Sequence, residues 1–193
     1  MILSGRVRNL LQRNTLQNLL TYDSFGIGKT SFANILIKSL GNNAITAKSR
    51  KMSDILDIYK INHKTSVIGG NFVALIDEAG ALHIDTQKAI LRHFEDTDTV
   101  IDATIFIVND ITGISRAIKS RCKEIDFSWR EDETKQLLEA VYTRMAINLD
   151  IEEVKCSKSV FNEYVSFYCV DGDIRKVISE IQGSISRDFE LLV

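Results

Sequence analysis

The feature that most constrains the fold of this chain is the short segment Gly26-Ile27-Gly28-Lys29-Thr30 with its flanks. It follows the apolar run 19–22 and opens a segment whose apolar residues recur at helical spacing. Glycines let backbone N–H groups approach a polyphosphate, and a helix N-terminus adds unpaired donors, so strand, glycine loop and helix together indicate a phosphate-binding loop. The helical face consists of Phe32, Ile35, Leu36 and Leu40. The residues expected to hold the nucleotide are Gly26, Ile27, Gly28, Lys29, Thr30 and Ser31.

The loop departs from the full pattern at one position. That pattern starts with a glycine five residues before Gly28, where this chain has Asp23. A carboxylate near a triphosphate is unfavourable unless its side chain points away. The alternative interpretation is a chance Gly-Lys-Thr at the start of a helix.

Composition limits the class of protein. The chain has 193 residues and a net charge of −2, so nucleic acid could be contacted only through a local basic patch. Its three cysteines lack C-x-x-C spacing and are expected to be reduced thiols of a cytosolic protein. No apolar run approaches ~18 residues, so no membrane span is expected.

The first 127 residues alternate between the two kinds of secondary structure, which predicts a base domain of the α/β class with a parallel sheet. Continuous apolar runs at 72–76 and 104–108 are typical of fully buried parallel strands. The remaining strands are expected at 16–22, 44–47 and 124–127, and helices at 1–14, 30–40, 53–59, 85–95 and 114–120. Lys48, Arg50 and Lys51 form a small basic cluster that we interpret as a solvated turn.

Residues 128–193 have a different pattern. Ser128 and Glu131 form a capping box, and three helical segments without strands follow, at about 132–145, 157–169 and from 172 onward. This predicts a small α-helical domain. Trp129, at the junction, is interpreted as a packing residue.

Polar residues follow the two buried strands. Asp77 and Glu78 end the run 72–76, and Asn109 ends the run 104–108. In an open α/β sheet, ligands bind beyond the C-terminal strand ends, where the glycine loop also lies. We expect Asp77 and Thr30 to hold Mg²⁺, Glu78 to orient the attacking water, and Asn109 to position that water or contact the γ-phosphate. Alternatively, the two acids only cap the next helix.

Five segments together resemble one family. Residues 75–79 look like a Walker B segment, 104–109 like sensor 1, 118–122 like a Ser-Arg-Cys motif, 171–176 like sensor 2, and 86–92 like the helix after Walker B. In this order they resemble the AAA+ ATPases of the clamp-loader type, the small subunits of replication factor C and phage DNA-polymerase accessory proteins. The resemblance covers about residues 16–185 and implies a P-loop AAA+ base at 1–127 with a three-helix lid at 128–193.

The resemblance implies roles for two arginines. Arg121 would be an arginine finger that reaches the nucleotide of a neighbouring subunit, and Arg175 a sensor 2 residue acting on its own nucleotide. The alternatives are a surface residue for Arg121 and an ion pair on a helix face for Arg175.

The resemblance also implies a function: an ATPase that uses ATP and Mg²⁺ to help load a sliding clamp on primer-template DNA during replication, in a hetero-oligomer with other clamp-loader subunits. Rival interpretations are another AAA+ enzyme, such as a helicase loader or branch-migration motor, and a non-hydrolysing structural subunit. The family's Tyr-Arg-Pro segment near adenine has no match, and neither does its C-terminal collar. A truncated, split or viral version, in the host cytoplasm, is therefore expected, mostly monomeric and nearly inactive alone.

Overall fold

The computed structural model describes residues 17–39, 41–47, 50–60, 72–95, 99–128, 133, 135–140, 143, 162–164, 166 and 173–190. The chain forms two compact units. One contains the first strand together with Gly28–Phe127, and the other contains Ser24–Ile27 with Ser128–Val193. That these units act as a nucleotide-binding base and a lid remains a prediction.

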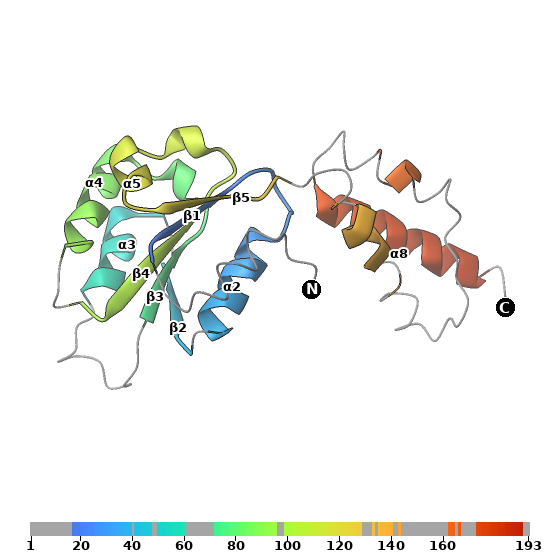
Figure 1. The fold of residues 1–193 in the computed structure, drawn as a ribbon, viewed down its shortest axis with the longest axis horizontal. Helices are drawn as coiled ribbons and strands as arrows, with labels where there is room; N and C mark the ends of the chain where they lie inside the picture. Colours follow the sequence, from blue (N-terminus) through green and yellow to red (C-terminus); the bar gives the residue numbers. More distant parts are fainter. Residues whose placement is uncertain are drawn as a thin grey trace. The chain divides into compact units, whose positions relative to one another are not determined.

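The larger unit is built on a five-stranded parallel sheet (Figure 1). Its strands are β1 (Leu19–Tyr22), β2 (Asn43–Thr46), β3 (Phe72–Ile76), β4 (Ile101–Ile107) and β5 (Lys123–Asp126). Their order in the sheet is β2-β3-β4-β1-β5, with every neighbouring pair parallel. The α/β fold with a parallel sheet, predicted from the alternating pattern, is confirmed.

The strand order determines where the helices lie. The helices are α2 (Lys29–Ser39), α3 (Met52–Tyr59), α4 (Ile84–His93) and α5 (Arg116–Lys119). Connections between parallel strands are right-handed. Helix α2 connects β1 to β2 in one direction across the sheet, and the three later helices connect their strands in the opposite direction. The later helices must therefore lie on the face opposite to α2. Figure 1 shows this arrangement, with α2 on one side of the sheet and α3, α4 and α5 on the other.

Both faces of the sheet are apolar because buried parallel strands must pack on helices at each side. All five residues of β3 are buried. One core cluster joins alternate residues of β1, β3 and β4 to α3, α4 and α5. On the other face α2 buries Phe32, whose ring lies 5.3 Å from that of Phe127, and Leu36. The predicted inner face of this helix is wrong at Ile35, which is exposed because the buried stripe instead runs through Ala33 and Ile37.

Element boundaries differ from the predictions by a few residues. β4 begins at Ile101, three residues earlier than predicted, because the exposed Asp102 interrupts the apolar run. Two 3-10 turns, η1 (Ala79–Ala81) and η2 (Ile111–Gly113), follow β3 and β4 and were not predicted.

In the other unit, α8 (Ile174–Glu190) starts where the third helix of this region was predicted. Ile174, Val177 and Ile181 are buried at helical spacing. The predicted helix at 1–14 and most of that at 157–169 lie outside the described residues, whereas the described part of 132–145, residues 133, 135–140 and 143, is helical. Within the described part of the chain, no helix combines the length and apolarity that crossing a membrane requires.

Candidate nucleotide-binding site

The loop between β1 and α2 has the backbone of an anion-binding turn. Gly26 and Gly28 have φ angles of 75° and 92°, which side chains disfavour. A Cβ at Gly28 would meet no atom within 4 Å, so the space beside its backbone is open to a ligand. Helix α2 begins immediately after it, with Phe32 N donating to Gly28 O at 2.9 Å. The turn can therefore receive a phosphate at a helix N-terminus.

Lys29 joins this loop to the end of β4. Its side chain is only 5% exposed, and its Nζ donates to Asp23 O at 2.6 Å and to Asn109 Oδ1 at 3.0 Å. The sheet order explains the contact, because β4 is the neighbour of β1 and the chain leaves these two strands toward opposite faces. The structure thus places an ammonium group at the point where α/β sheets bind ligands, and brings together the predicted residues Lys29 and Asn109.

Thr30 and Asp77 meet at the same edge of the sheet. Thr30 Oγ1 donates to Asp77 Oδ2 at 3.0 Å, and Asp77 Oδ1 accepts from Glu78 N at 2.8 Å. A hydroxyl and one carboxylate suit Mg²⁺, which binds one or two carboxylates and completes its shell with water and phosphate. A cluster of three or more His, Cys, Asp or Glu side chains for a metal does not occur among the described residues. The donor set therefore fits a metal that arrives with a nucleotide.

Glu78 has an unusual conformation and a specific partner. Its φ of 52° is left-handed, and its carboxylate lies 3.1 Å from Arg50 Nη1, with both side chains 58% exposed. Arg50 precedes α3 and belongs to the basic cluster interpreted as a solvated turn. Its exposure agrees with that interpretation, but its contact with Glu78 was not predicted. Nothing in the spacing of the two residues indicates that they meet.

Asp23 also has a backbone conformation that favours glycine. Its φ is 128°, at the position where the full loop pattern has a glycine. Its carbonyl oxygen accepts the hydrogen bond from Lys29. The chain therefore keeps the turn that a glycine would provide, at the expense of strain in a residue with a side chain.

Gln87 ties the segment after β3 to the segment after β4. The side chain is 2% exposed. Its Nε2 donates to Leu82 O at 3.1 Å and to Gly113 O at 2.9 Å, and its Oε1 accepts from Ser115 N at 2.8 Å. The two segments also touch directly, because a Cβ on Gly113 would lie 2.5 Å from Gly80 O. Gln87 lies in the helix that resembles the one after Walker B in the family, but this role of its side chain was not predicted.

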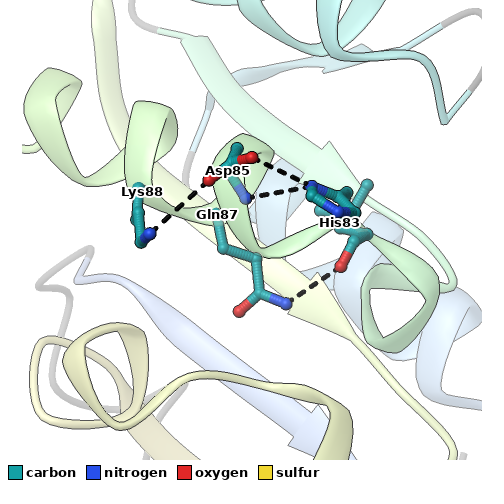
Figure 2. A network of polar contacts seen from close by, with 5 residues as sticks. His83, Asp85, Gln87 and Lys88 are labelled. Carbon is teal, nitrogen blue, oxygen red and sulfur yellow. Dashed lines mark hydrogen bonds and ion pairs between the residues drawn. The ribbon is translucent and has the colours of Figure 1, made fainter.

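Figure 2 shows the start of α4, the helix that carries Gln87. His83 Nδ1 accepts from Asp85 N at 3.3 Å and caps the helix, while Lys88 Nζ lies 3.5 Å from Asp85 Oδ1. At the end of β4, Asp110 accepts from the hydroxyl and the backbone N–H of Thr112 at 2.6 and 2.8 Å. These bonds lower the pKa of Asp110, and the bond from the Thr112 hydroxyl contributes most to this change. The contacts of Asp110 close the turn that directly follows Asn109.

Arg121 lies outside this group of contacts, whereas Arg175 lies beside Gly26 of the loop, because a Cβ on Gly26 would be 2.9 Å from Arg175 Nε. Arg121 follows α5, and its guanidinium contacts Glu95 Oε1 and Ala117 O, each at 3.4 Å. Arg175 lies in the first turn of α8, in the other unit, where its Nε is 3.5 Å from Asp173 Oδ1. The site described within the larger unit thus consists of Asp23, Lys29, Thr30, Asp77, Glu78 and Asn109, and the roles of both arginines remain predictions.

Several known proteins are similar to this chain in sequence. No protein-family model matches the chain. The replication factor C small subunit of Haloarcula marismortui is 28% identical over 95% of this chain and 57% of its own length. A replication factor C small subunit of Pyrobaculum arsenaticum is 28% identical over 97% of this chain and 58% of its own length. These relatives are archaeal, so the prediction of a viral source gains no support from them.

Solved structures agree on the fold. The RuvB Holliday junction branch migration motor of Thermotoga maritima matches 77% of this chain and 52% of its own, with a TM-score of 0.59 and 19% identity. At that identity the likeness concerns the fold alone. The chain spans somewhat more than half the length of these small subunits. Motifs, sheet order and relatives agree: the chain has the α/β P-loop fold of AAA+ ATPases, and its predicted resemblance to replication factor C subunits is confirmed.

Proposed function

We propose that this chain is an ATP-binding and ATP-hydrolysing subunit of a clamp loader. The observation that carries the proposal is the pair of contacts at one sheet edge, Lys29 to Asn109 and Thr30 to Asp77, 3.0 Å each. The similarity of nearly the whole chain to replication factor C small subunits favours the clamp-loader class. The likeness to RuvB concerns only the fold, so it does not favour a branch-migration motor.

Binding of the triphosphate follows from the loop. Backbone N–H groups beside Gly26 and Gly28 donate to phosphate oxygens, and the Lys29 ammonium balances their charge. Two partners of that ammonium, Asp23 O and Asn109 Oδ1, are uncharged oxygens. A phosphate at this point therefore adds an anion beside a cation that is already held in place.

Hydrolysis requires a metal and a positioned water. Thr30 and Asp77 would hold Mg²⁺, which would supply positive charge to neutralise the phosphates. Glu78 accepts a hydrogen bond from the water and orients it. Its carboxylate is paired with Arg50 here, so this ion pair opens, or shares the carboxylate, before the water is held. The turn at Glu78 is fixed by the contact of Gly80 with Gly113.

The chain is proposed to act in an assembly. Arg121 lies on the surface, 45% exposed, and the described contacts of its side chain are with Ala117 of α5 and with Glu95. This position suits a finger that stabilises charge on a nucleotide bound by a neighbouring subunit. The proposed partners are other clamp-loader subunits, a sliding clamp and primer-template DNA. Arg175 is proposed to act on the chain's own nucleotide.

Two measurements test the proposal. ATP turnover is measured with and without a sliding clamp and primed DNA; stimulation by both supports the loader, and nucleotide binding without any turnover contradicts hydrolysis. Then Lys29→Ala chains, which offer Arg121 but bind ATP only weakly, are mixed with Arg121→Ala chains, which bind ATP but offer no finger, at an ATP concentration that fills only the second kind of chain. Recovery of turnover supports a shared site. Co-assembly without recovery shows a site complete within one chain.

A further inference from the structure

We propose that Glu95 is a positioning residue for Arg121, and that its carboxylate holds the guanidinium in the orientation from which it reaches a neighbouring nucleotide. The inference rests on the proposed function, because it assigns a part of the chain to the shared site. It begins from one contact: Arg121 Nη2 lies 3.4 Å from Glu95 Oε1.

The backbone of Arg121 is held in place by the fold, so only the orientation of its side chain depends on a further contact. Ile118, at the end of α5, is fully buried. The turn after it is closed by three backbone hydrogen bonds of 2.9 to 3.2 Å, donated by Ser120, Arg121 and Cys122. Cys122 packs against the core cluster. The Cα of Arg121 is therefore held by the fold, while its flexible side chain is half exposed.

Glu95 comes from another element, the end of α4. It follows α4 directly after Phe94, whose N–H donates to Leu91 O at 3.3 Å. The Phe94 ring meets the ring of Phe106, in the centre of the sheet, edge-on at 6.2 Å between centroids. The carboxylate thus starts from the end of a helix that lies next to α5, since Ile90 of α4 and Ile118 of α5 belong to the same core cluster.

The geometry leaves the guanidinium able to bind an anion. Arg121 Nη1 donates to Ala117 O at 3.4 Å, and Nη2 faces Glu95, so the two ends of the fork have separate partners on the chain. A guanidinium has five N–H donors. Two contacts therefore orient the group without using all its donors, and an oriented arginine loses less rotamer freedom when it meets a phosphate.

The exposure of the pair sets the size of the effect. Arg121 and Glu95 are 45% and 75% exposed. Exposed ion pairs contribute little, so loss of the carboxylate is expected to lower Arg121-dependent turnover by about 2- to 5-fold. The KM for ATP should stay unchanged, since Arg121 does not touch the chain's own Lys29 among the contacts described.

Nuclear magnetic resonance relaxation of the Arg121 Nε–H group in the free 193-residue chain tests the contact directly. Glu95→Ala should lower the order parameter of this group, and Glu95→Gln, which keeps an acceptor oxygen, should lower it less. Asp57→Asn is the matched control, because it removes another exposed ion pair, that of Asp57 with Lys60 on α3. Equal order parameters in the native chain and Glu95→Ala would overturn the proposal.

The mixing experiment tests the consequence for catalysis. Lys29→Ala donors that also carry Glu95→Ala should restore turnover 2- to 5-fold less well than donors carrying Asp57→Asn. A Lys29→Ala chain that also carries Arg121→Ala has lost the finger, so adding Glu95→Ala to it should not lower the turnover of the mixture any further. This is the result expected of two residues that act together. Equal or better recovery with Glu95→Ala overturns the positioning role. No recovery with any donor overturns the shared site instead, and the relaxation data still decide the contact.

Discussion

Replacing Asp23 by glycine should stabilise the chain and tighten ATP binding. The φ of 128° at Asp23 lies in a region that non-glycine residues occupy at a cost of about 1–3 kcal/mol. Glycine removes this strain but adds backbone entropy to the unfolded chain, which offsets up to about 1 kcal/mol. The net expectation is a gain of about 1 kcal/mol in the free energy of unfolding, or about 2–4 °C in melting temperature.

The same substitution removes a carboxylate from the phosphate loop. A unit charge about 4 Å from another in water contributes about 1 kcal/mol, so ATP should bind roughly 5-fold more tightly. Asp23→Asn separates the two effects, because it removes the charge and keeps the strained side chain; it should tighten ATP binding without the gain in stability. Urea unfolding and a titration with a fluorescent ATP analogue measure both. A glycine variant that unfolds at lower urea than the native chain would refute the strain argument.

Three further predictions concern single residues. Glu78→Gln should leave ATP affinity unchanged and lower turnover by ~100-fold or more in a steady-state assay, whereas an equal loss of binding would make Glu78 structural. Gln87→Ala leaves three backbone groups without this partner, so the free energy of unfolding measured by urea titration should fall by about 3 kcal/mol. A loss below about 1 kcal/mol would contradict the role of Gln87 in connecting the two segments. Burial raises the pKa of Cys122 to about 12, so iodoacetamide should label it slowly at pH 8 and faster as the pH rises towards that value, and labelling as fast as in the unfolded chain would contradict this.

The sequence predicted the parallel sheet and one edge of the site for a physical reason. Continuous apolar runs can be buried only between two layers of helices, and residues at the carboxyl ends of such strands must share an edge. Lys29 and Asn109, eighty residues apart, could therefore be expected to meet, and their contact is present. Thr30 and Asp77 are brought together for the same reason.

Other parts could not be predicted because they depend on which turns touch. The ion pair of Arg50 with Glu78 joins two loops whose approach is set by the register of β2 on β3. The tie made by Gln87 depends on two 3-10 turns that carry no apolar period. Ile35 was assigned to the wrong face because an apolar residue one position from a buried stripe has the spacing of a core residue. Only packing distinguishes it.

The most direct test of the account is a calorimetric titration of ATP, with Mg²⁺ present, into three chains: the native protein, Lys29→Ala and Lys38→Ala. Lys38 is the matched control, because it is an exposed lysine on the same helix, α2. Charge-assisted hydrogen bonds of a buried ammonium predict that Lys29→Ala weakens ATP binding by about 10- to 100-fold while Lys38→Ala has no effect. Equal affinities in the native chain and Lys29→Ala would contradict a nucleotide site at this edge of the sheet.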